Sequence, residues 1–370
     1  MFLDISSQFS ENSYSSPSLV AMLSQRLDEK QRQTHKRNMR IGRTLVDILP
    51  DFYAQRAKEL GSELSYPWLS RGEKICFRNV ASNPETFPLS FCDLGVIVPR
   101  AQEIAEVYTS LVRDSALHPK IKILRFLDSS SAALKQANQI VAGSSLDLSF
   151  EQQTFEAMSF SCSYGEVPEC RYKKTLEGDF VLVPELVTVQ RRILALLGRT
   201  LNNFDSPAEV LSRIFYKNLS PTDVGIVEAR VKAVSLDEYS GALAAYRAYV
   251  HEVLGISQTH TKQGQSVFLE EDGSSLYANV SLEEDLQLSA KQMLLFACKE
   301  SFLRKGTKIR FFRNQAINPQ DFASDLLPHN LEVFHYDSCD PDGIFYIRSV
   351  TPPTVYGTSC SIKMDNNLFL

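Results

Sequence analysis

The sequence predicts an α/β protein with a parallel sheet, followed by a smaller mixed α+β part. The first two-thirds of the chain alternates short apolar segments with segments of helical spacing, a pattern typical of parallel sheets. The clearest apolar strand is KIKILRFL, and RILALL follows the same rule. The expected strands are 90–95, 120–127, 192–197 and 225–234, and the expected helices are 99–114, about 129–141, 207–215 and 236–254.

The last hundred residues have a different pattern, which predicts the smaller part. Asp272 and Gly273 separate two alternating segments, and this pair is a strong signal for a β-hairpin. A second hairpin is expected around the acidic turn 337–343. A long amphipathic helix is expected over 282–305, a strand over 308–313 and a short helix over 319–327. We expect this part to cover the mouth of the parallel sheet.

Four regions follow from these patterns. Residues 1–17 are polar and rich in serine, which predicts a flexible leader. Residues 18–260 are expected to hold an N-terminal helical part, broken near Gly42 and Pro50, and the parallel sheet. Residues 261–350 form the α+β substrate or lid domain, and residues 351–370 form a tail.

The composition is that of an ordinary globular protein. The 370 residues are 44% hydrophobic and 22% charged, with a net charge of -5, which argues against broad nucleic-acid binding. No apolar run is long enough to cross a bilayer, and the N-terminus lacks the apolar core of a signal peptide. Seven cysteines without a paired framework and without metal-ligand spacing indicate a reducing compartment and no metal site. We therefore expect a cytoplasmic protein that binds neither membrane nor nucleic acid.

Asp128 is the strongest local candidate for a binding residue. It follows the strand KIKILRFL, and a carboxylate at the end of the second strand of such a sheet can accept both hydroxyl hydrogens of a ribose. Asp128 is also a good N-cap for the helix that follows. From this element alone, the two interpretations stay equally open.

Gly95 occupies the place of a glycine turn after the first strand. A cofactor loop needs glycine where backbone approaches a ligand closely. The residues that follow are Val96, Ile97, Val98 and Pro99, so a second glycine is missing and branched side chains crowd the loop.

The stretch RILALLGRTLNNF at 192–204 resembles the "LGxTLGNF" signature of the histidine-specific methyltransferases, which make the trimethylated histidine precursor of ergothioneine. Other stretches match in order. LPDFYAQR at 49–56 is similar to "LPEYYPTR", LDS at 127–129 to "VDVS", and GDF at 178–180 to "GDF". Further similarity lies at 306–309, 318–322 and 342–345, so the resemblance covers roughly residues 40–350.

This resemblance implies a class I (Rossmann-like) methyltransferase that uses S-adenosyl-L-methionine to N-methylate an amino acid or a similar small amine. It implies cofactor contacts from Gly95, Asp128 and Asp179. It also implies that Tyr53 and Asn203 orient the amino-acid end of the substrate and act as the catalytic pair. The remaining substrate contacts would come from Tyr239, Phe312 and Asn314.

Departures from the family pattern limit these expectations. Phe312 and Asn314 occupy the positions at which the family binds its histidine substrate with a glutamate and a serine. Histidine is therefore not the expected substrate. Ile97 replaces the second glycine of the cofactor loop, which favours an alternative: a methyltransferase fold that has lost catalysis and serves as a binding or regulatory partner of another protein. Without the resemblance, the sequence favours Asn203 as a helix cap and Tyr53 as an aromatic residue of the core.

Overall fold

The structure is a computed structural model. It describes residues 1–6, 27–94 apart from 70 and 88, 121–128, 134, 135, 138, 147–152, 169–174, 180–185, and 191–350 apart from 217, 218, 234, 241, 262–266 and 297. The helix expected at 99–114, most of the one at 129–141, and the tail 351–370 lie outside these residues.

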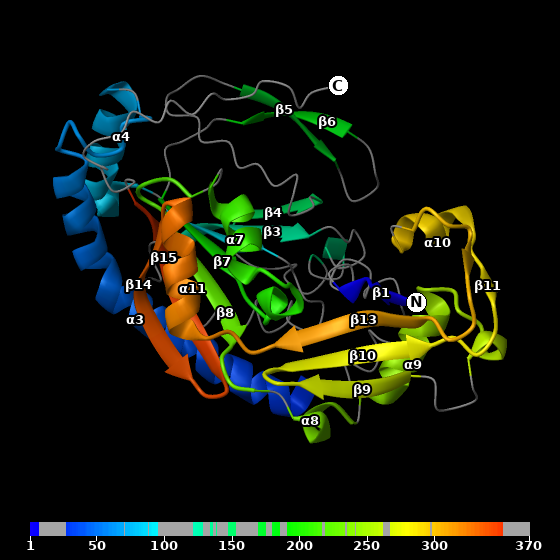
Figure 1. Ribbon diagram of the computed structural model, residues 1–370. Helices are drawn as coiled ribbons and strands as arrows, with labels where there is room; N and C mark the ends of the chain where they lie inside the picture. Colours follow the sequence, from blue (N-terminus) through cyan, green and yellow to red (C-terminus); the bar gives the residue numbers. More distant parts are fainter. Residues whose placement is uncertain are drawn as a thin grey trace, which may run out of the picture.

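A seven-stranded sheet forms the main body (Figure 1). Its strand order is β14-β15-β8-β7-β2-β3-β4, and all strands are parallel except β15, which runs against both of its neighbours. This order with one reversed strand is that of the class I methyltransferase fold, so the predicted fold class is confirmed. The strands are β2 (Leu89–Leu94), β3 (Ile121–Asp128), β4 (Asp147–Gln152), β7 (Arg191–Leu196), β8 (Val224–Arg230), β14 (Leu331–Cys339) and β15 (Asp342–Ser349).

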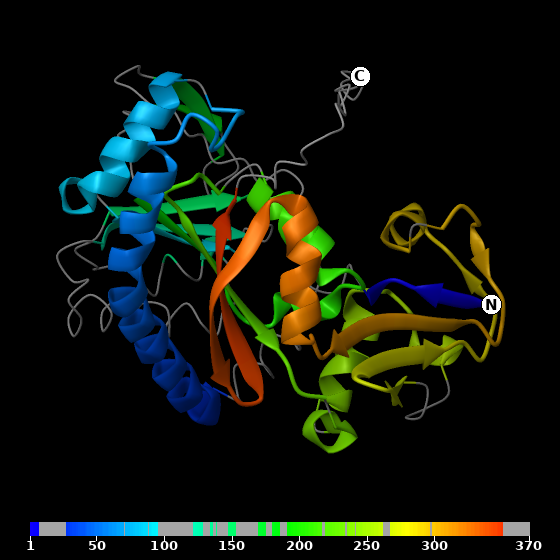
Figure 2. The ribbon, with the colours of Figure 1, turned by 60° about the vertical axis from the view of Figure 1, so that its left-hand side comes forward.

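Helices cover both faces of this sheet (Figure 2). Helix α3 (Leu27–Glu59) lies on one face, and α7 (Pro207–Tyr216) and α11 (Pro319–Leu326) lie on the other. The strands can therefore be apolar on both sides, and every residue of β7 and β8 is buried. Helix α4 (Arg71–Ser82) and the short turn η3 (Pro84–Thr86) follow α3 and lead into β2.

The predicted break of the N-terminal helix near Gly42 and Pro50 is wrong, because α3 runs through both positions. Proline removes one hydrogen bond from a helix interior. The apolar side chains on either side of Pro50, Leu49 and Phe52, are buried against the sheet. Their packing holds the helix together across the missing bond.

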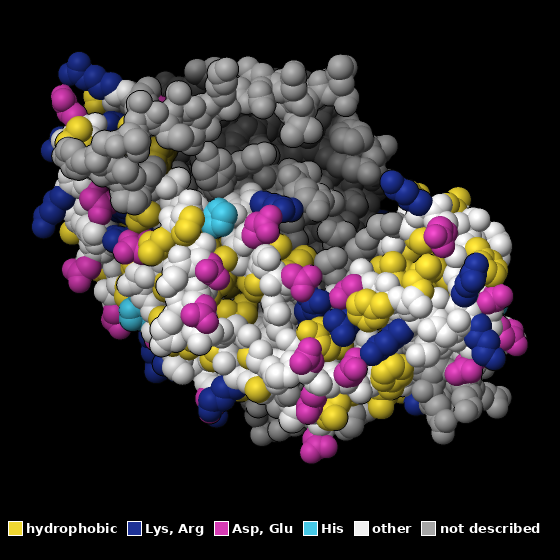
Figure 3. Space-filling model, viewed as in Figure 1, with side chains coloured by type: hydrophobic (Ala, Val, Ile, Leu, Met, Phe, Trp, Pro, Cys, Tyr) yellow, Lys and Arg dark blue, Asp and Glu magenta, His cyan; other side chains and the backbone are white. Residues whose placement is uncertain are grey.

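A small lobe stands beside the main body. It contains a four-stranded sheet of order β1-β13-β10-β9, covered on one face by α9 (Leu243–Glu252). Its strands are β1 (Phe2–Asp4), β9 (Val267–Asp272), β10 (Ser275–Ser281) and β13 (Lys308–Gln315), and the short helix α8 (Leu236–Ser240) precedes α9. The predicted hairpin at Gly273 is confirmed, with a positive φ of 59°. Figure 3 shows basic and acidic side chains interspersed over this side of the molecule.

The chain divides differently from the prediction. Strands β14 and β15 complete the main sheet, so residues 261–350 are not one separate domain. The first residues are not a flexible leader either, because β1 pairs in parallel with β13 and Ile5 is buried. The small lobe is thus built from both the beginning and the middle of the chain.

The long helix expected at 282–305 is also wrong. The segment contains β11 (Leu286–Gln287), the short helix α10 (Ala290–Leu295) and β12 (Phe302–Leu303). Leu286 and Leu288 are both buried, and this spacing of two is that of a strand. Ser289 then begins α10 with a capping box to Gln292, which fixes the helix start eight residues later than expected.

Two further pairs of short strands and two short helices, η5 (Gln258–His260) and η6 (Leu327–His329), are also described. Strands β5 (Glu169–Lys174) and β6 (Phe180–Glu185) form a hairpin, and β11 pairs with β12. None of the described helices is both long and apolar enough to cross a membrane. The described residues also contain no group of three or more side chains that could hold a metal ion.

Candidate active site

The candidate site lies at the carboxyl edge of the main sheet, where the strand order reverses. From β2 the chain adds β3 and β4 on one side, and later adds β7 and β8 on the other side. In sheets of this kind, ligands bind outside the carboxyl ends of the strands at such a switch point. Gly95 directly follows β2, Asp128 is the last residue of β3, and Asn203 ends the turn after β7. Gly95, Asp179 and the side chain of Asp128 lie outside the described residues.

The turn after β7 is held in an unusual backbone conformation. Gly198 has a φ of 99° and Arg199 a φ of 64°, and the short helix η4 (Thr200–Asn203) follows. Asn202 is fully buried and fixes this helix. Its Nδ2 donates to the carbonyls of Arg230 (2.9 Å) and Gln315 (2.6 Å), and its Oδ1 accepts from the Arg230 N–H. Asn202 thus joins the turn to β8 and β13, and the half-buried Asn203 lies next to it.

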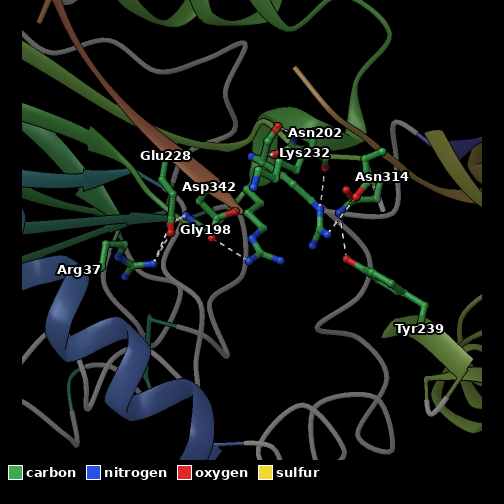
Figure 4. A network of polar contacts seen from close by, with 11 residues as sticks. Arg37, Gly198, Asn202, Glu228, Lys232, Tyr239, Asn314 and Asp342 are labelled. Atoms are coloured by element: carbon green, nitrogen blue, oxygen red, sulfur yellow. Dashed lines mark hydrogen bonds and ion pairs between the residues drawn. The ribbon is translucent and has the colours of Figure 1, made fainter. Parts of the chain in front are cut away.

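Glu228 organises the carboxyl edge from within β8 (Figure 4). Its two oxygens accept hydrogen bonds of 2.6 and 2.7 Å from the Arg37 guanidinium. It also accepts a bond of 2.6 Å from the Gly198 N–H. The Glu228 side chain is only 3% exposed, so a charge-assisted bond of this kind is among the stronger ones in a protein. One carboxylate therefore ties α3, β8 and the turn after β7 together.

A second ion pair lies beside the first. The Arg199 guanidinium donates to Asp342 at the start of β15, at 2.7 Å. Burial raises the pKa of the Asp342 carboxyl, and Arg199 opposes that rise. Asp342 Oδ1 is buried and accepts no hydrogen bond from the described residues. Burial alone would lower the pKa of Arg199, but Asp342 raises it above its ordinary value, so this guanidinium stays charged.

The structure brings three predicted substrate residues together. Asn314 Nδ2 donates to the Tyr239 hydroxyl at 3.1 Å, and the rings of Tyr239 and Phe312 lie 5.9 Å apart. Tyr239 is also close enough to Arg199 to contribute to the raised pKa of that residue. Asn314 is 5% exposed, and its Oδ1 has no partner among the described residues. An aromatic and amide group from the small lobe therefore meets the carboxyl edge of the main sheet.

Tyr53 does not join this group. It belongs to α3 and is buried in the core between this helix and the sheet. The Arg191 guanidinium lies 5.4 Å from its ring centroid. Arg191 is the first residue of β7, whereas Asn203 lies beyond the last. Tyr53 and Asn203 thus lie at opposite ends of a strand. Burial raises the pKa of the Tyr53 hydroxyl. This position agrees with the alternative interpretation, in which Tyr53 is a core aromatic residue.

Sequence reasoning missed four charged residues of the carboxyl edge, namely Arg37, Arg199, Glu228 and Asp342. One signal was present. Glu228 is the only acidic residue in the apolar strand VGIVEAR, and an acid within a buried strand needs a partner. The partners themselves could not be read from the sequence.

Comparison with known proteins adds little to this picture. No family model matches the chain, and no curated protein matches it. The solved structures that it resembles include an S-adenosylmethionine-dependent methyltransferase from Clostridium acetobutylicum (12% identity, covering 73% of this chain and 87% of that one, TM-score 0.33). The CcbJ methyltransferase from Streptomyces caelestis is similar at 10% identity, with 75% and 89% covered and a TM-score of 0.31. A putative Zn-dependent alcohol dehydrogenase from Rhodobacter sphaeroides is similar at 9% identity, with 74% of this chain and 88% of that one covered and a TM-score of 0.31. Likeness at this level assigns no activity, and the fold class depends on the strand order.

Proposed function

We propose that the protein is an S-adenosyl-L-methionine-dependent N-methyltransferase that acts on an amino acid or a similar small amine other than histidine. One observation carries the proposal. Gly95 follows β2, Asp128 ends β3 and Asn203 ends the turn after β7, and these three adjacent strands flank the switch point of a class I methyltransferase sheet. The resemblance of the sequence to histidine-specific methyltransferases supports the same three positions.

The residue types that the sequence supplies at this edge would suit the cofactor. A carboxylate at the end of β3 suits a ribose diol, and a glycine after β2 allows backbone to approach the nucleoside. Asp179 would contact the adenine side, as the resemblance implies. The cofactor supplies an activated methyl group, so the protein has to align a neutral amine and exclude water.

The substrate would lie between the small lobe and the turn after β7. Tyr239 and Phe312 offer an aromatic wall, and the buried Asn314 Oδ1 offers an acceptor for an N–H group. An unpaired buried acceptor costs about 1–3 kcal/mol, which a bound amine would recover. Asn203 would orient the amino-acid end of the substrate from the opposite side.

We also propose that the protein works in the cytoplasm. Among the cysteines that the structure describes, Cys76, Cys298 and Cys339 are free thiols. Free thiols persist in reducing compartments.

The cofactor is tested by isothermal titration with S-adenosylmethionine and with S-adenosylhomocysteine. We expect saturable binding that is lost in Asp128→Ala. The matched control is Asp147→Ala, which removes a carboxylate from the other end of the neighbouring strand β4 and should bind as the wild type does. A folded protein that binds neither compound would contradict the proposal.

That negative result would favour a second candidate, a methyltransferase fold that serves as a binding or regulatory partner. Its supporting observation is Ile97, which takes the place of a glycine in the cofactor loop. The substrate is tested separately by transfer of labelled methyl from the cofactor to a panel of amines. Asn314→Ala should lower kcat/KM for the amine and leave the affinity for the cofactor unchanged.

A further inference from the structure

A cavity of about 410 Å³ opens at the other edge of the main sheet. Its walls come from α3, α4, η3 and the first residue of β7. In Figure 1 the strands β3 and β4 point away from α4, so this cavity lies at the amino ends of the strands. It is separated from the candidate active site by the length of β7, and its volume lies in the range of small-molecule sites.

The walls of this cavity are mostly apolar. Leu45, Leu49 and Ala57 line it from α3, and Ala81 lines it from α4. Pro50 also lines it and has no N–H, so the Val46 carbonyl, which belongs to another lining residue, cannot receive its usual helical bond. The cavity therefore offers an apolar surface with one helix carbonyl that lacks its normal donor.

A buried cation also lines the cavity. Arg191 is 2% exposed, and its Nε and one terminal nitrogen donate to the Phe87 carbonyl at 3.2 and 3.0 Å. Within the described part of the chain, no carboxylate lies within ion-pair distance of Arg191. Glu85 also lines the cavity, where its charge adds to the raised pKa of Tyr53, but its side chain is exposed and water screens it in part. A buried guanidinium without a counter-ion is costly, and an anion in the cavity would compensate it.

We propose that this cavity binds a small amphipathic organic acid, with its apolar body against α3 and α4 and its anionic group on Arg191. The site is separate from the proposed methyl-transfer site and does not depend on it. Tyr53 supports the same ligand class, because it lines the cavity beside Arg191 and burial raises the pKa of its hydroxyl. A phenol that stays neutral can donate a hydrogen bond to an anion.

The test uses the full chain and the fluorescent probe anilinonaphthalene sulfonate, which combines an aromatic body with one acidic group. We expect saturable binding of one probe per chain. Arg191→Met should weaken it by about tenfold or more, since one charge-assisted contact is lost. The neutral analogue N-phenylnaphthylamine should bind the wild type about tenfold more weakly than the sulfonate. Equal affinities for the two probes would overturn the acidic ligand class.

A second pair of variants locates the probe. Ala54→Phe places a ring into the cavity from an exposed position on α3, and Gln55→Phe adds the same ring at the next exposed position, outside the lining. Binding should be lost in the first variant and kept in the second. Binding that is unsaturable, or equal in both variants, would overturn the proposal. Circular dichroism of each variant checks that the chain is folded.

Discussion

The two ends of strand β7 differ in how buried charge is compensated. Beyond the carboxyl end, the Glu228 carboxylate is matched by Arg37, and Asp342 is matched by Arg199. At the amino end, Arg191 is buried just as deeply, yet none of the described carboxylates pairs with it. A paired network holds strand ends and turns in place, whereas an unpaired buried cation leaves binding capacity for a ligand. The paired charges beyond the carboxyl end of β7 therefore stabilise the fold, whereas the buried Arg191 at the amino end can bind a ligand.

Two neighbouring arginines make the comparison sharp. Successive side chains of a strand point to opposite faces, so Arg191 faces α3 and the cavity, and Arg192 faces the other side. Arg192 bonds to the Asp223 carboxylate through its terminal nitrogen at 2.5 Å and through its Nε at 3.1 Å. Asp223 is fully buried and also accepts two bonds from Ser220. The same residue type therefore has a buried carboxylate partner at one position and none among the described residues at the next.

The largest effect is expected for Arg192→Met. The change leaves the buried Asp223 carboxylate without a counter-charge, which should lower the free energy of unfolding by about 3–5 kcal/mol. Denaturant unfolding of the purified chain measures this. The control is Arg213→Met, which breaks an exposed pair with Glu209 and should cost less than about 1 kcal/mol. Equal losses in the two variants would show that burial does not set the value of the pair.

Glu228→Ala tests the network at the carboxyl end. It removes the partner of both Arg37 and the Gly198 N–H, so we expect a loss of about 2–3 kcal/mol in the free energy of unfolding. Asp340→Ala, which breaks the exposed pair with Lys232, should cost less than about 1 kcal/mol. The Glu228 variant should also bind the cofactor more weakly, because the turn before Asn203 loses its anchor. Unchanged stability and cofactor affinity would contradict the role of Glu228.

Four strands of the main sheet, β2, β3, β7 and β8, could be predicted because their buried side chains form short apolar runs in the sequence, whereas the edge strand β4 was not predicted. The apolar run RILALL and the Asp-Gly turn at 272–273 are local signals, and the structure contains both the strand and the hairpin. The assignment of β14 and β15 failed for a different reason. A hairpin can be recognised locally, but the sheet that it joins is decided by contacts far along the chain.

The candidate site was predicted in part from strand ends and in part from the family resemblance, which supplied Tyr239, Phe312 and Asn314. Asp128 is the last residue of β3 and Asn203 ends the turn after β7, so both lie at the carboxyl edge. The Arg37–Glu228 pair joins residues 191 positions apart, and no local pattern links them. Tyr53 was misplaced because α3, with 33 residues, is about 50 Å long and runs along the whole sheet. One helix therefore delivers Arg37 to one edge and Tyr53 to the other.

A pH series on Asp342→Asn tests how the second ion pair is balanced. The pKa of Asp342 is raised in the folded protein, chiefly by burial, so the folded state holds its proton more tightly than the unfolded state. Its contribution to stability is full below the ordinary carboxyl pKa and is lost as pH rises through the folded value. We expect the stability of the variant relative to the wild type to improve as pH rises from about 3.5 to 7. Denaturant unfolding at each pH measures this, and a relative stability that falls over that range would show that Arg199 outweighs burial.

The smallest change in stability is expected for Arg191→Met, the counterpart of Arg192→Met on the next residue. The variant gives up two hydrogen bonds to the Phe87 carbonyl but also removes a buried cation that has no carboxylate partner among the described residues. Replacing a poorly compensated buried charge with an apolar side chain of similar volume is often neutral or stabilising. We therefore expect a free energy of unfolding within about 1 kcal/mol of the wild type. Denaturant unfolding without added ligand measures it beside the Arg192 variant. A loss as large as that of Arg192→Met would mean that the fold itself requires the Arg191 charge, and the cavity above it would then lose its claim to an anionic ligand.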